Sequence, residues 1–164
     1  MRIYLGSDHA GFDLKEKVKA FLKGEGYEVV DCGAEAYDKD DDYPVFIGRA
    51  AECVSKNPGS WGIIFGGSGQ GEAMVANRFS GVRCALFYGP CVAMSAIDVT
   101  GKKSDDSFEM LSLTREHNDS NMLSLGSRFL KEEEAIKAVK IFLESPFSGS
   151  ARHKRRIDMI DRRG

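Results

Sequence analysis

Short apolar runs alternate with helical patterns along the chain, and this alternation limits the folds open to it more than any other feature. Most of the runs lack alternating polar residues, which is typical of strands buried on both faces of a sheet. The predicted strands are Ile3–Gly6, Tyr27–Cys32, Gly62–Phe65, Val82–Phe87 and Met122–Leu125. Strands that alternate with helices predict an α/β fold: a Rossmann-like, doubly wound, five-stranded parallel sheet with flanking helices.

The helical patterns lie between these strands. After the first strand, apolar residues recur at helical spacing from Leu14 to Leu22, and glycines follow as a stop signal. Further helices are predicted over Val45–Val54, Ala73–Phe79 and Glu132–Leu143, and the basic end of the chain is expected to form an amphipathic helical tail. Because 164 residues contain no internal repeat or linker, we expect a single domain over residues 1–164.

A glycine-rich loop follows the third predicted strand. Glycines occupy positions 66, 67, 69 and 71, and Glu72 follows where a helix should begin. Glycines let backbone N–H groups approach a ligand closely, and a helix start adds partial positive charge. Glu72 would repel a phosphate at this place. The loop is therefore interpreted as a cradle for a different anion, an enediolate formed as Glu72 removes a carbon-bound proton.

Composition excludes several classes of function. A net charge of −2 argues against a general binder of nucleic acid or anionic membranes, and no apolar run is long enough to span a bilayer. The four cysteines show neither C-x-x-C nor zinc-ligand spacing, so buried free thiols and no metal are expected. The N-terminus enters a strand directly, so no signal peptide and a cytoplasmic location are expected. The basic tail is interpreted as a solvated helix rather than a nucleic-acid patch.

Ligands of doubly wound sheets bind beyond the carboxyl ends of the strands. Asp8 and His9 follow the first strand, the glycine loop follows the third, and Arg128 follows the fifth. Residues 115–119, before the fifth strand, and the basic residues 152–156 are expected to join the same crevice. Such a cluster suits proton transfer on a small anionic substrate. Three plainer interpretations stay open: Asp8 could cap the following helix, Arg128 could pair with a glutamate at 132 to 134, and His117 could be structural.

Together these motifs resemble the type B ribose-5-phosphate isomerases, in order and over nearly the whole chain. The wider group also contains galactose-6-phosphate and allose-6-phosphate isomerases. The matching segments are Gly6-Ser7-Asp8-His9-Ala10-Gly11, Asp42-Tyr43-Pro44, Gly66-Gly67-Ser68-Gly69-Gln70-Gly71-Glu72, Ala76-Asn77-Arg78, Arg115-Glu116-His117-Asn118, Gly126-Ser127-Arg128 and Arg152-His153-Lys154-Arg155-Arg156-Ile157.

The resemblance implies aldose–ketose isomerisation of a phosphorylated sugar through a cis-enediolate, without metal or organic cofactor. One subtype of the family uses a cysteine base at the position of Gly66, and the other uses a glutamate at the position of Glu72. This chain resembles the glutamate subtype, with Glu72 moving the proton between C1 and C2. Ser68 would assist at the sugar oxygens, and N–H groups of residues 67 to 72, including Gly67, Gly69 and Gly71, would hold the enediolate.

The resemblance also implies roles for residues outside the loop. His117 would open the furanose ring, with Asp8 at the same oxygens. The implied phosphate ligands are Arg128, Arg152 and Arg156, and the residues that line the sugar are His9, Tyr43 and Asn118. In the family the site forms between two subunits, with the histidine and one arginine facing the partner's glycine loop. A homodimer or a tetramer is thus expected, with residues 148–164 docked on the partner.

One segment departs from the family pattern. An insertion lies within about residues 89–107, where family members run more directly to the histidine. Its polar middle predicts an exposed loop; a lid or altered dimer packing are the alternatives.

The expected substrate pair is ribose 5-phosphate and ribulose 5-phosphate, with a six-carbon sugar phosphate as the alternative. A nucleotide- or flavin-binding module is disfavoured because no register supplies G-x-G-x-x-G. A non-catalytic phosphosugar-binding protein is disfavoured by the intact Glu72, Ser68 and His117.

Overall fold

The computed structural model describes residues 1–162; residues 163 and 164, the end of the predicted tail, lie outside it. Strands and helices alternate as predicted. In chain order the elements are β1 (Arg2–Ser7), α1 (Phe12–Gly24), β2 (Glu28–Asp31), α2 (Tyr43–Lys56), β3 (Trp61–Gly66), α3 (Gln70–Ala76), β4 (Cys84–Phe87), α4 (Glu109–Asn118), β5 (Met122–Gly126), α5 (Glu132–Glu144) and α6 (Ala151–Asp161).

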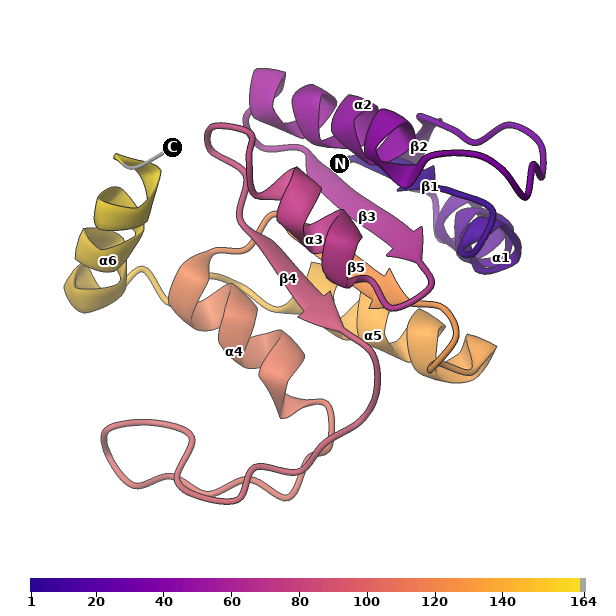
Figure 1. Cartoon of the computed structure of the whole chain (residues 1–164). Coiled ribbons are helices and arrows are strands. Elements are labelled where there is room, and N and C mark those ends of the chain that lie inside the picture. The colour runs from indigo at the N-terminus through magenta and orange to yellow at the C-terminus, as the bar shows by residue number, and fades with distance from the viewer. Residues whose placement is uncertain (163–164) are drawn as a thin grey trace.

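All five strands pair in parallel, in the order β2-β1-β3-β5-β4, which confirms the predicted fold class. Helices α2 and α3 cover one face of the sheet, and α1, α4 and α5 cover the other (Figure 1). The chain winds outward from β1 to β2 and then returns to β3 on the far side of β1. The strand order therefore reverses between β1 and β3, and a crevice is expected at their carboxyl ends.

The core explains why the strands lack polar alternation. Ile63 and Phe65 of β3 pack into the cluster beneath α1 and α5, whereas Ile64 between them packs into the cluster beneath α2. All three side chains are fully buried. Each such side chain contributes about 1.5–3 kcal/mol to folding, so both faces of the central strand must be apolar.

Helix α3 begins and ends three residues earlier than predicted. Gly69 adopts a left-handed φ of +75°, so the chain turns directly from the loop into the helix at Gln70. At the other end, the Asn77 side chain donates to the Ala73 carbonyl and accepts from the Cys84 N–H at 2.8 Å, which closes the helix. As a result Glu72 lies within the first turn of α3.

The tail helix α6 stands apart from the sheet (Figure 1). Ser150 caps it by accepting from the His153 N–H, and the Ser148 N–H donates to the Glu116 carbonyl of α4 at 3.1 Å. Within the described chain none of its residues is buried, and Met159 and Ile160 are about half exposed. Helix α6 is thus formed as predicted, but its apolar side chains lack cover in a single chain.

The cysteines are free thiols, as expected, but none of the four is fully buried. Cys32, Cys53 and Cys84 are half-buried, whereas Cys91 in the insertion is exposed. Burial raises the pKa of the Cys32 thiol to about 12 and raises that of Cys84 as well, so neither is a ready nucleophile. Among residues 1–162, no helix combines the length and apolarity that crossing a membrane requires.

Candidate active site

The carboxylate of Glu72 lies directly over Gly66. A Cβ atom at residue 66 would overlap both Oε1 and Cδ of Glu72. The side chain of Glu72 therefore fills the space that a side chain at residue 66 would occupy. Glu72 is only 5% exposed. Burial raises the pKa of its carboxyl group and the charge of Asp8 raises it further, whereas a hydrogen bond from its own backbone N–H lowers it. A carboxylate with raised proton affinity suits a base.

The glycine loop is held by contacts that leave no room for side chains. The Gly69 carbonyl accepts from the buried hydroxyl of Ser124 at 2.7 Å, and the Gln70 N–H donates to Ser68 Oγ at 3.3 Å. A Cβ at residue 71 would lie 2.7 Å from Tyr43 Oη. The loop is therefore fixed between β5 on one side and the start of α2 on the other.

The side chain of Arg128, which follows β5, packs against the glycine loop. A Cβ at Gly67 would be 3.2 Å from the guanidinium carbon of Arg128, so the guanidinium packs on the loop backbone. The Arg128 N–H donates to the Gly67 carbonyl at 3.1 Å. The suggested pairing of Arg128 with helix α5 is not supported, because Glu132 pairs with Lys17 and Glu134 accepts from its own helix cap.

These groups line one hollow of about 520 Å³, named here the glycine-loop hollow. It lies at the carboxyl ends of β1 and β3, where the reversal of strand order places it. Its lining includes the predicted residues Asp8, His9, Tyr43, Gly67, Ser68, Gly71, Glu72 and Arg128, and also Ala10, Gln70 and Met74. The structure thus brings together the predicted residues that follow β1, β3 and β5.

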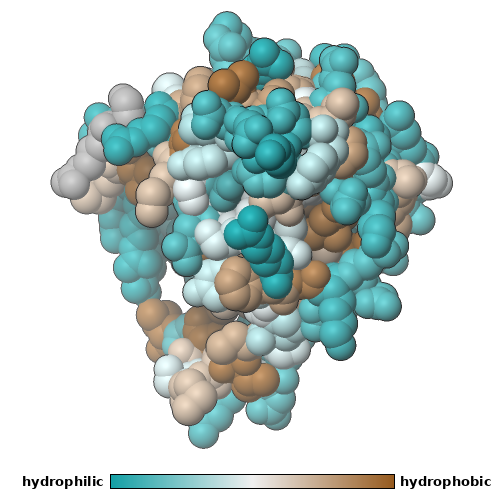
Figure 2. Space-filling model, turned by 45° about the vertical axis from the view of Figure 1, so that its right-hand side comes forward, coloured by the Kyte–Doolittle hydropathy of each residue, from teal (hydrophilic) through white to brown (hydrophobic). Residues whose placement is uncertain are grey.

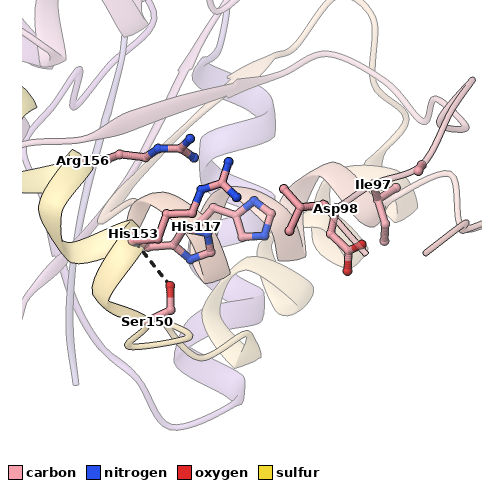
Figure 3. Close-up of a pocket in the computed structure, with 9 residues that line it drawn as sticks. Ile97, Asp98, His117, Ser150, His153 and Arg156 are labelled. Carbon is pink, nitrogen blue, oxygen red and sulfur yellow. Dashed lines mark hydrogen bonds between the residues drawn. The ribbon is translucent and has the colours of Figure 1, made fainter. Parts of the chain in front are cut away.

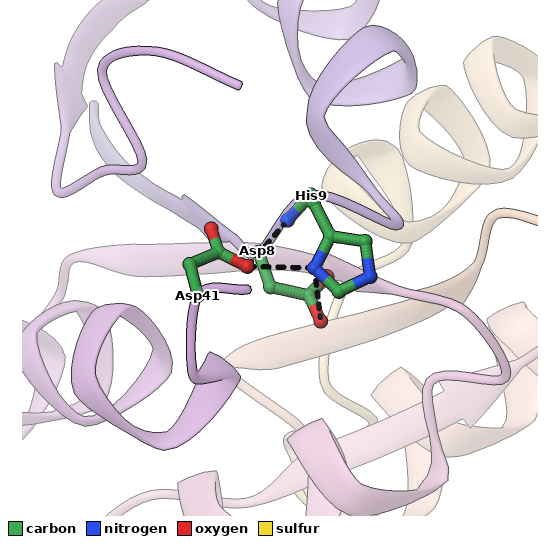
Figure 4. Close-up of side chains that lie close together, drawn as sticks. All are labelled: Asp8, His9 and Asp41. Atoms are coloured by element: carbon green, nitrogen blue, oxygen red, sulfur yellow. Dashed lines mark hydrogen bonds and ion pairs between the residues drawn. The ribbon is translucent and has the colours of Figure 1, made fainter. Parts of the chain in front are cut away.

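Asp8 is buried but does not cap α1. Its Oδ1 accepts from the Ala10 N–H at 3.0 Å, whereas the cap of α1 is Gly11, with no side-chain bond. Asp8, His9 and Asp41 each place one ligand atom within 4.8 Å of the others, which is the spacing of a metal site (Figure 4). Hydrogen bonds from His9 to Asp41 account for this cluster.

A second hollow of about 610 Å³, named here the tail hollow, contains three further predicted residues, His117, Arg152 and Arg156 (Figure 3). Its lining combines His117 of α4, Arg152 and Arg156 of α6 and Ala96–Val99 of the insertion. His153 also lines it, with its ring centroid 4.4 Å from that of His117 and its Nδ1 2.8 Å from Ser148 Oγ. Arg152 and Arg156 bring positive charge to this hollow, and Asp98, which also lines it, offsets part of that charge.

One sequence expectation is wrong for a single chain: the segment before β5 does not reach the glycine-loop hollow. Arg115 of that segment lies with its guanidinium 4.1 Å from the ring centroid of Trp61, the first residue of β3, whereas the glycine loop follows the last. Strand β5, about 16 Å long at 3.3 Å per residue, separates the two ends of the sheet. Among the described residues, the two hollows share no lining residue.

Asn118 joins neither hollow in the described chain. It is exposed at the end of α4, and its carbonyl accepts from Arg83 Nε at 2.9 Å. Its expected contact with the sugar is therefore not formed within one chain.

Sequence reasoning passed over two residues of these sites. Asp41 holds His9, but it lies in a run of acidic residues that is typical of a solvated loop. His153 packs on His117, and the only signal for it was its place within the matching tail motif. In both cases the partner is distant in sequence, which no local pattern reveals.

Comparisons with known proteins agree with the resemblance seen in the sequence. A family model described as ribose/galactose isomerase matches residues 3–100 and 106–160. Ribose-5-phosphate isomerase B of Mycolicibacterium paratuberculosis is 42% identical over 160 residues, covering 98% of this chain and 89% of that protein. The crystal structure of ribose-5-phosphate isomerase B from Mycoplasma genitalium with bound ribulose 5-phosphate has a TM-score of 0.85 and 37% identity, covering 99% of this chain and 95% of that one. The Thermotoga maritima enzyme has a TM-score of 0.82, also at 37% identity, covering 98% of this chain and 97% of that one.

Proposed function

The chain belongs to the ribose/galactose isomerase family, and on that premise we propose that it interconverts ribose 5-phosphate and ribulose 5-phosphate. The single observation that carries the proposal is the buried carboxylate of Glu72 over Gly66, at the edge of a glycine-lined hollow. The relative from Mycoplasma genitalium holds ribulose 5-phosphate, the product of this reaction. A phosphorylated sugar is therefore the substrate.

Glu72 is the base in this proposal. Its carboxylate takes a proton from C2 of the open-chain aldose and returns it to C1, so that the sugar passes through a cis-enediolate. Backbone N–H groups of residues 67–72 hold the negative oxygens, and Ser68 moves protons between them. The position of Glu72, which fills the space of a side chain at residue 66, supports the glutamate subtype, in which none of the four cysteines is required.

The two hollows support a site built from two chains. Ring opening by His117 requires it to approach Asp8, yet the two residues line different hollows of one chain. In a homodimer the tail hollow of one subunit can face the glycine-loop hollow of the other. Uncovered Met159 and Ile160 on α6 give the tail an apolar surface with which to dock on that partner.

Phosphate binding follows from the same arrangement. Arg152 and Arg156 line the tail hollow, whereas Arg128 lies on the glycine loop. A substrate held between two facing hollows would meet guanidinium groups from both subunits, which suits the bidentate preference of arginine for phosphate oxygens. Asn118 and Tyr43 would then reach the sugar from opposite sides.

The family model matches most of the expected insertion within about residues 89–107 and leaves out only residues 101–105, so the insertion is shorter than expected. The segment as a whole forms the expected exposed loop, with Met94 fully exposed, and projects from the body of the molecule (Figure 2). The Cys91 N–H donates to the Ser107 carbonyl at 2.8 Å, which closes its base. Because Ala96–Val99 also line the tail hollow, we propose that the insertion borders the bound substrate.

The test is turnover of ribose 5-phosphate and allose 6-phosphate by the wild type and by Glu72→Gln. A neutral amide cannot take up the proton, so kcat should fall by about 10²–10⁴-fold with the fold intact. Glu25→Gln, an exposed carboxylate at the end of α1, is the matched control and should keep full activity. Near-wild-type turnover by Glu72→Gln contradicts the proposal, and preference for allose 6-phosphate selects the six-carbon alternative.

A further inference from the structure

Asp41 is a half-buried residue of an acidic run, and its side chain is shielded from solvent. Residues 38 to 42 read Asp-Lys-Asp-Asp-Asp, yet the side chain of Asp41 is only 7% exposed, compared with 80% for Asp40. A carboxylate is rarely buried without a partner, because it loses its hydration. Some interaction must therefore draw Asp41, and not its neighbour, into the molecule.

That interaction is with His9. Oδ1 of Asp41 accepts from the backbone N–H of His9 at 3.0 Å and lies 2.7 Å from the ring Nδ1 (Figure 4). Oδ2 has no hydrogen-bond partner among residues 1–162. The hydrogen bonds of this carboxylate are therefore those to His9. A carboxylate only accepts hydrogen bonds, and the proton between them is therefore on Nδ1. Nε2 is left for the glycine-loop hollow, which His9 lines.

The loop that carries Asp41 is anchored independently. The fully buried Lys15 donates to the Ala34 carbonyl at 2.6 Å, and Ser7 and Ala34 are joined through a backbone hydrogen bond of 2.8 Å. Further along, the ring of Tyr37 meets the His9 ring edge-on, with centroids 6.3 Å apart. Asp41 itself holds both the backbone and the ring of His9.

Three charged groups face the His9 ring. Asp41 is in contact, Asp8 Oδ2 lies 4.0 Å from Nδ1, and Arg128 lies across the hollow. The hydrogen bond to Asp41 raises the pKa of His9, and burial lowers it. The charges of Asp8 and Asp41 also raise this pKa, whereas the charge of Arg128 lowers it. The net direction is upward, so the ring stays cationic to higher pH than a free histidine.

We propose that Asp41 is a positioning residue: it holds the His9 ring by Nδ1–H so that Nε2–H of the imidazolium donates to the phosphorylated sugar in the glycine-loop hollow. This inference rests on the proposed function. Asp41 is absent from the lining of that hollow and acts only through His9. The carboxylate–imidazole pair gives a substrate ligand with a fixed direction and a retained positive charge, which an isolated surface histidine lacks.

The direct test is nitrogen NMR of the histidine rings across the pH range. The chain has three histidines, and His9→Gln assigns the signal of His9. In the wild type, Nδ1 of His9 should carry the proton even when the ring is neutral, and the ring should titrate above about 6.5. In Asp41→Asn the midpoint should fall by ~0.5 unit or more. Asp40→Asn, in the same run but exposed, should leave it unchanged.

Kinetics give the second measurement. Imidazolium is lost as pH rises through the pKa of His9, so Asp41→Asn should raise the KM for ribose 5-phosphate at a lower pH than in the wild type. We expect about a tenfold rise near neutral pH with a smaller change in kcat, since Glu72 is untouched. Asp40→Asn should follow the wild type.

The outcomes separate two failures. A wild-type His9 with Nδ1 unprotonated in the neutral ring, or an unchanged midpoint in Asp41→Asn, overturns the role of Asp41. The first of these measurements needs no change at Asp41, so it decides the matter even where Asp41→Asn does not fold. If the wild type isomerises neither sugar, the proposed function fails, while the NMR result still tests the pair.

Discussion

The carboxylate of Glu72 occupies the space into which a side chain at residue 66 would project, and residue 66 is a glycine. The glycine at the end of β3 is therefore a steric requirement of the carboxylate six residues later. This relationship joins the backbone of the strand to the chemistry of the helix that follows it.

Gly66→Ala should displace the base. A Cβ at residue 66 cannot coexist with the observed position of Glu72 Oε1, and a shift of about 1 Å in a reacting group costs on the order of 100-fold in rate. We expect kcat for ribose 5-phosphate to fall by about this factor. Gly24→Ala is the control, because a Cβ there meets nothing within 4 Å. Unchanged kcat in Gly66→Ala contradicts the assigned position of the base.

The charge of Asp8 should be visible in the pH profile. Burial and Asp8 both raise the pKa of Glu72, and the base must be ionised, so activity should be lost as pH falls through a value above about 4.3. Asp8→Asn removes one of these causes. The acid limb of kcat/KM should then move to lower pH, even though the maximal rate also falls. An acid limb that stays in place means that another group controls it.

Glu72 should lower stability at neutral pH. Its folded-state pKa is raised above the unfolded value, so between the two values the folded chain binds more protons, and stability falls as pH rises. Glu72→Gln has no charge to bury. Thermal unfolding should therefore give Glu72→Gln a higher Tm than the wild type at pH 7, with the difference shrinking below the unfolded pKa of about 4.3. A lower Tm for the variant at pH 7 contradicts this.

Mixed dimers should reveal a site shared between subunits. Glu72→Gln and His117→Ala chains are each expected to be inactive on cyclic ribose 5-phosphate. Unfolded together and refolded, they form mixed dimers in which one of the two sites has both residues intact, which predicts about a quarter of wild-type activity. If both residues acted within one chain, the mixture would stay inactive. Native mass spectrometry of tagged chains provides the fraction of mixed dimers.

Removal of the insertion should change discrimination between sugars. Replacing residues 93–105 with a short glycine link removes the wall that Ala96–Val99 give the tail hollow, while the bond from Cys91 to Ser107 keeps the base closed. We expect the ratio of kcat/KM for allose 6-phosphate to that for ribose 5-phosphate to rise about tenfold. Met94→Ser, at a fully exposed position of the same loop, is the control. An unchanged ratio assigns the insertion no part in substrate choice.

The fold was predictable because its signals are local. Ile63, Ile64 and Phe65 form an unbroken apolar run since helices cover both faces of β3, and the same logic located all five strands. The start of α3 was predicted three residues late, because the left-handed turn at Gly69 is a backbone choice that apolar periodicity does not report. Glycine in the sequence allowed that turn without specifying it.

The site was predictable in part, for a different reason. Asp8, Ser68, Glu72 and Arg128 meet because parallel strands end at one edge, which is a general rule of the fold. His117 and Asn118 precede a strand, so the same rule places them at the opposite edge, and the expectation that they join the crevice of the glycine loop is wrong within one chain. Asp41 was hidden by its acidic neighbours, because burial of one carboxylate among several depends on a residue 32 positions away.

The exclusion between residue 66 and Glu72 also limits which pairs of side chains this chain can accept. A thiol at residue 66 would overlap the observed position of the Glu72 carboxylate, so one of the two side chains would have to move. We therefore expect a cysteine at residue 66 and a glutamate at residue 72 to be accommodated singly, but not together with Glu72 in its present place.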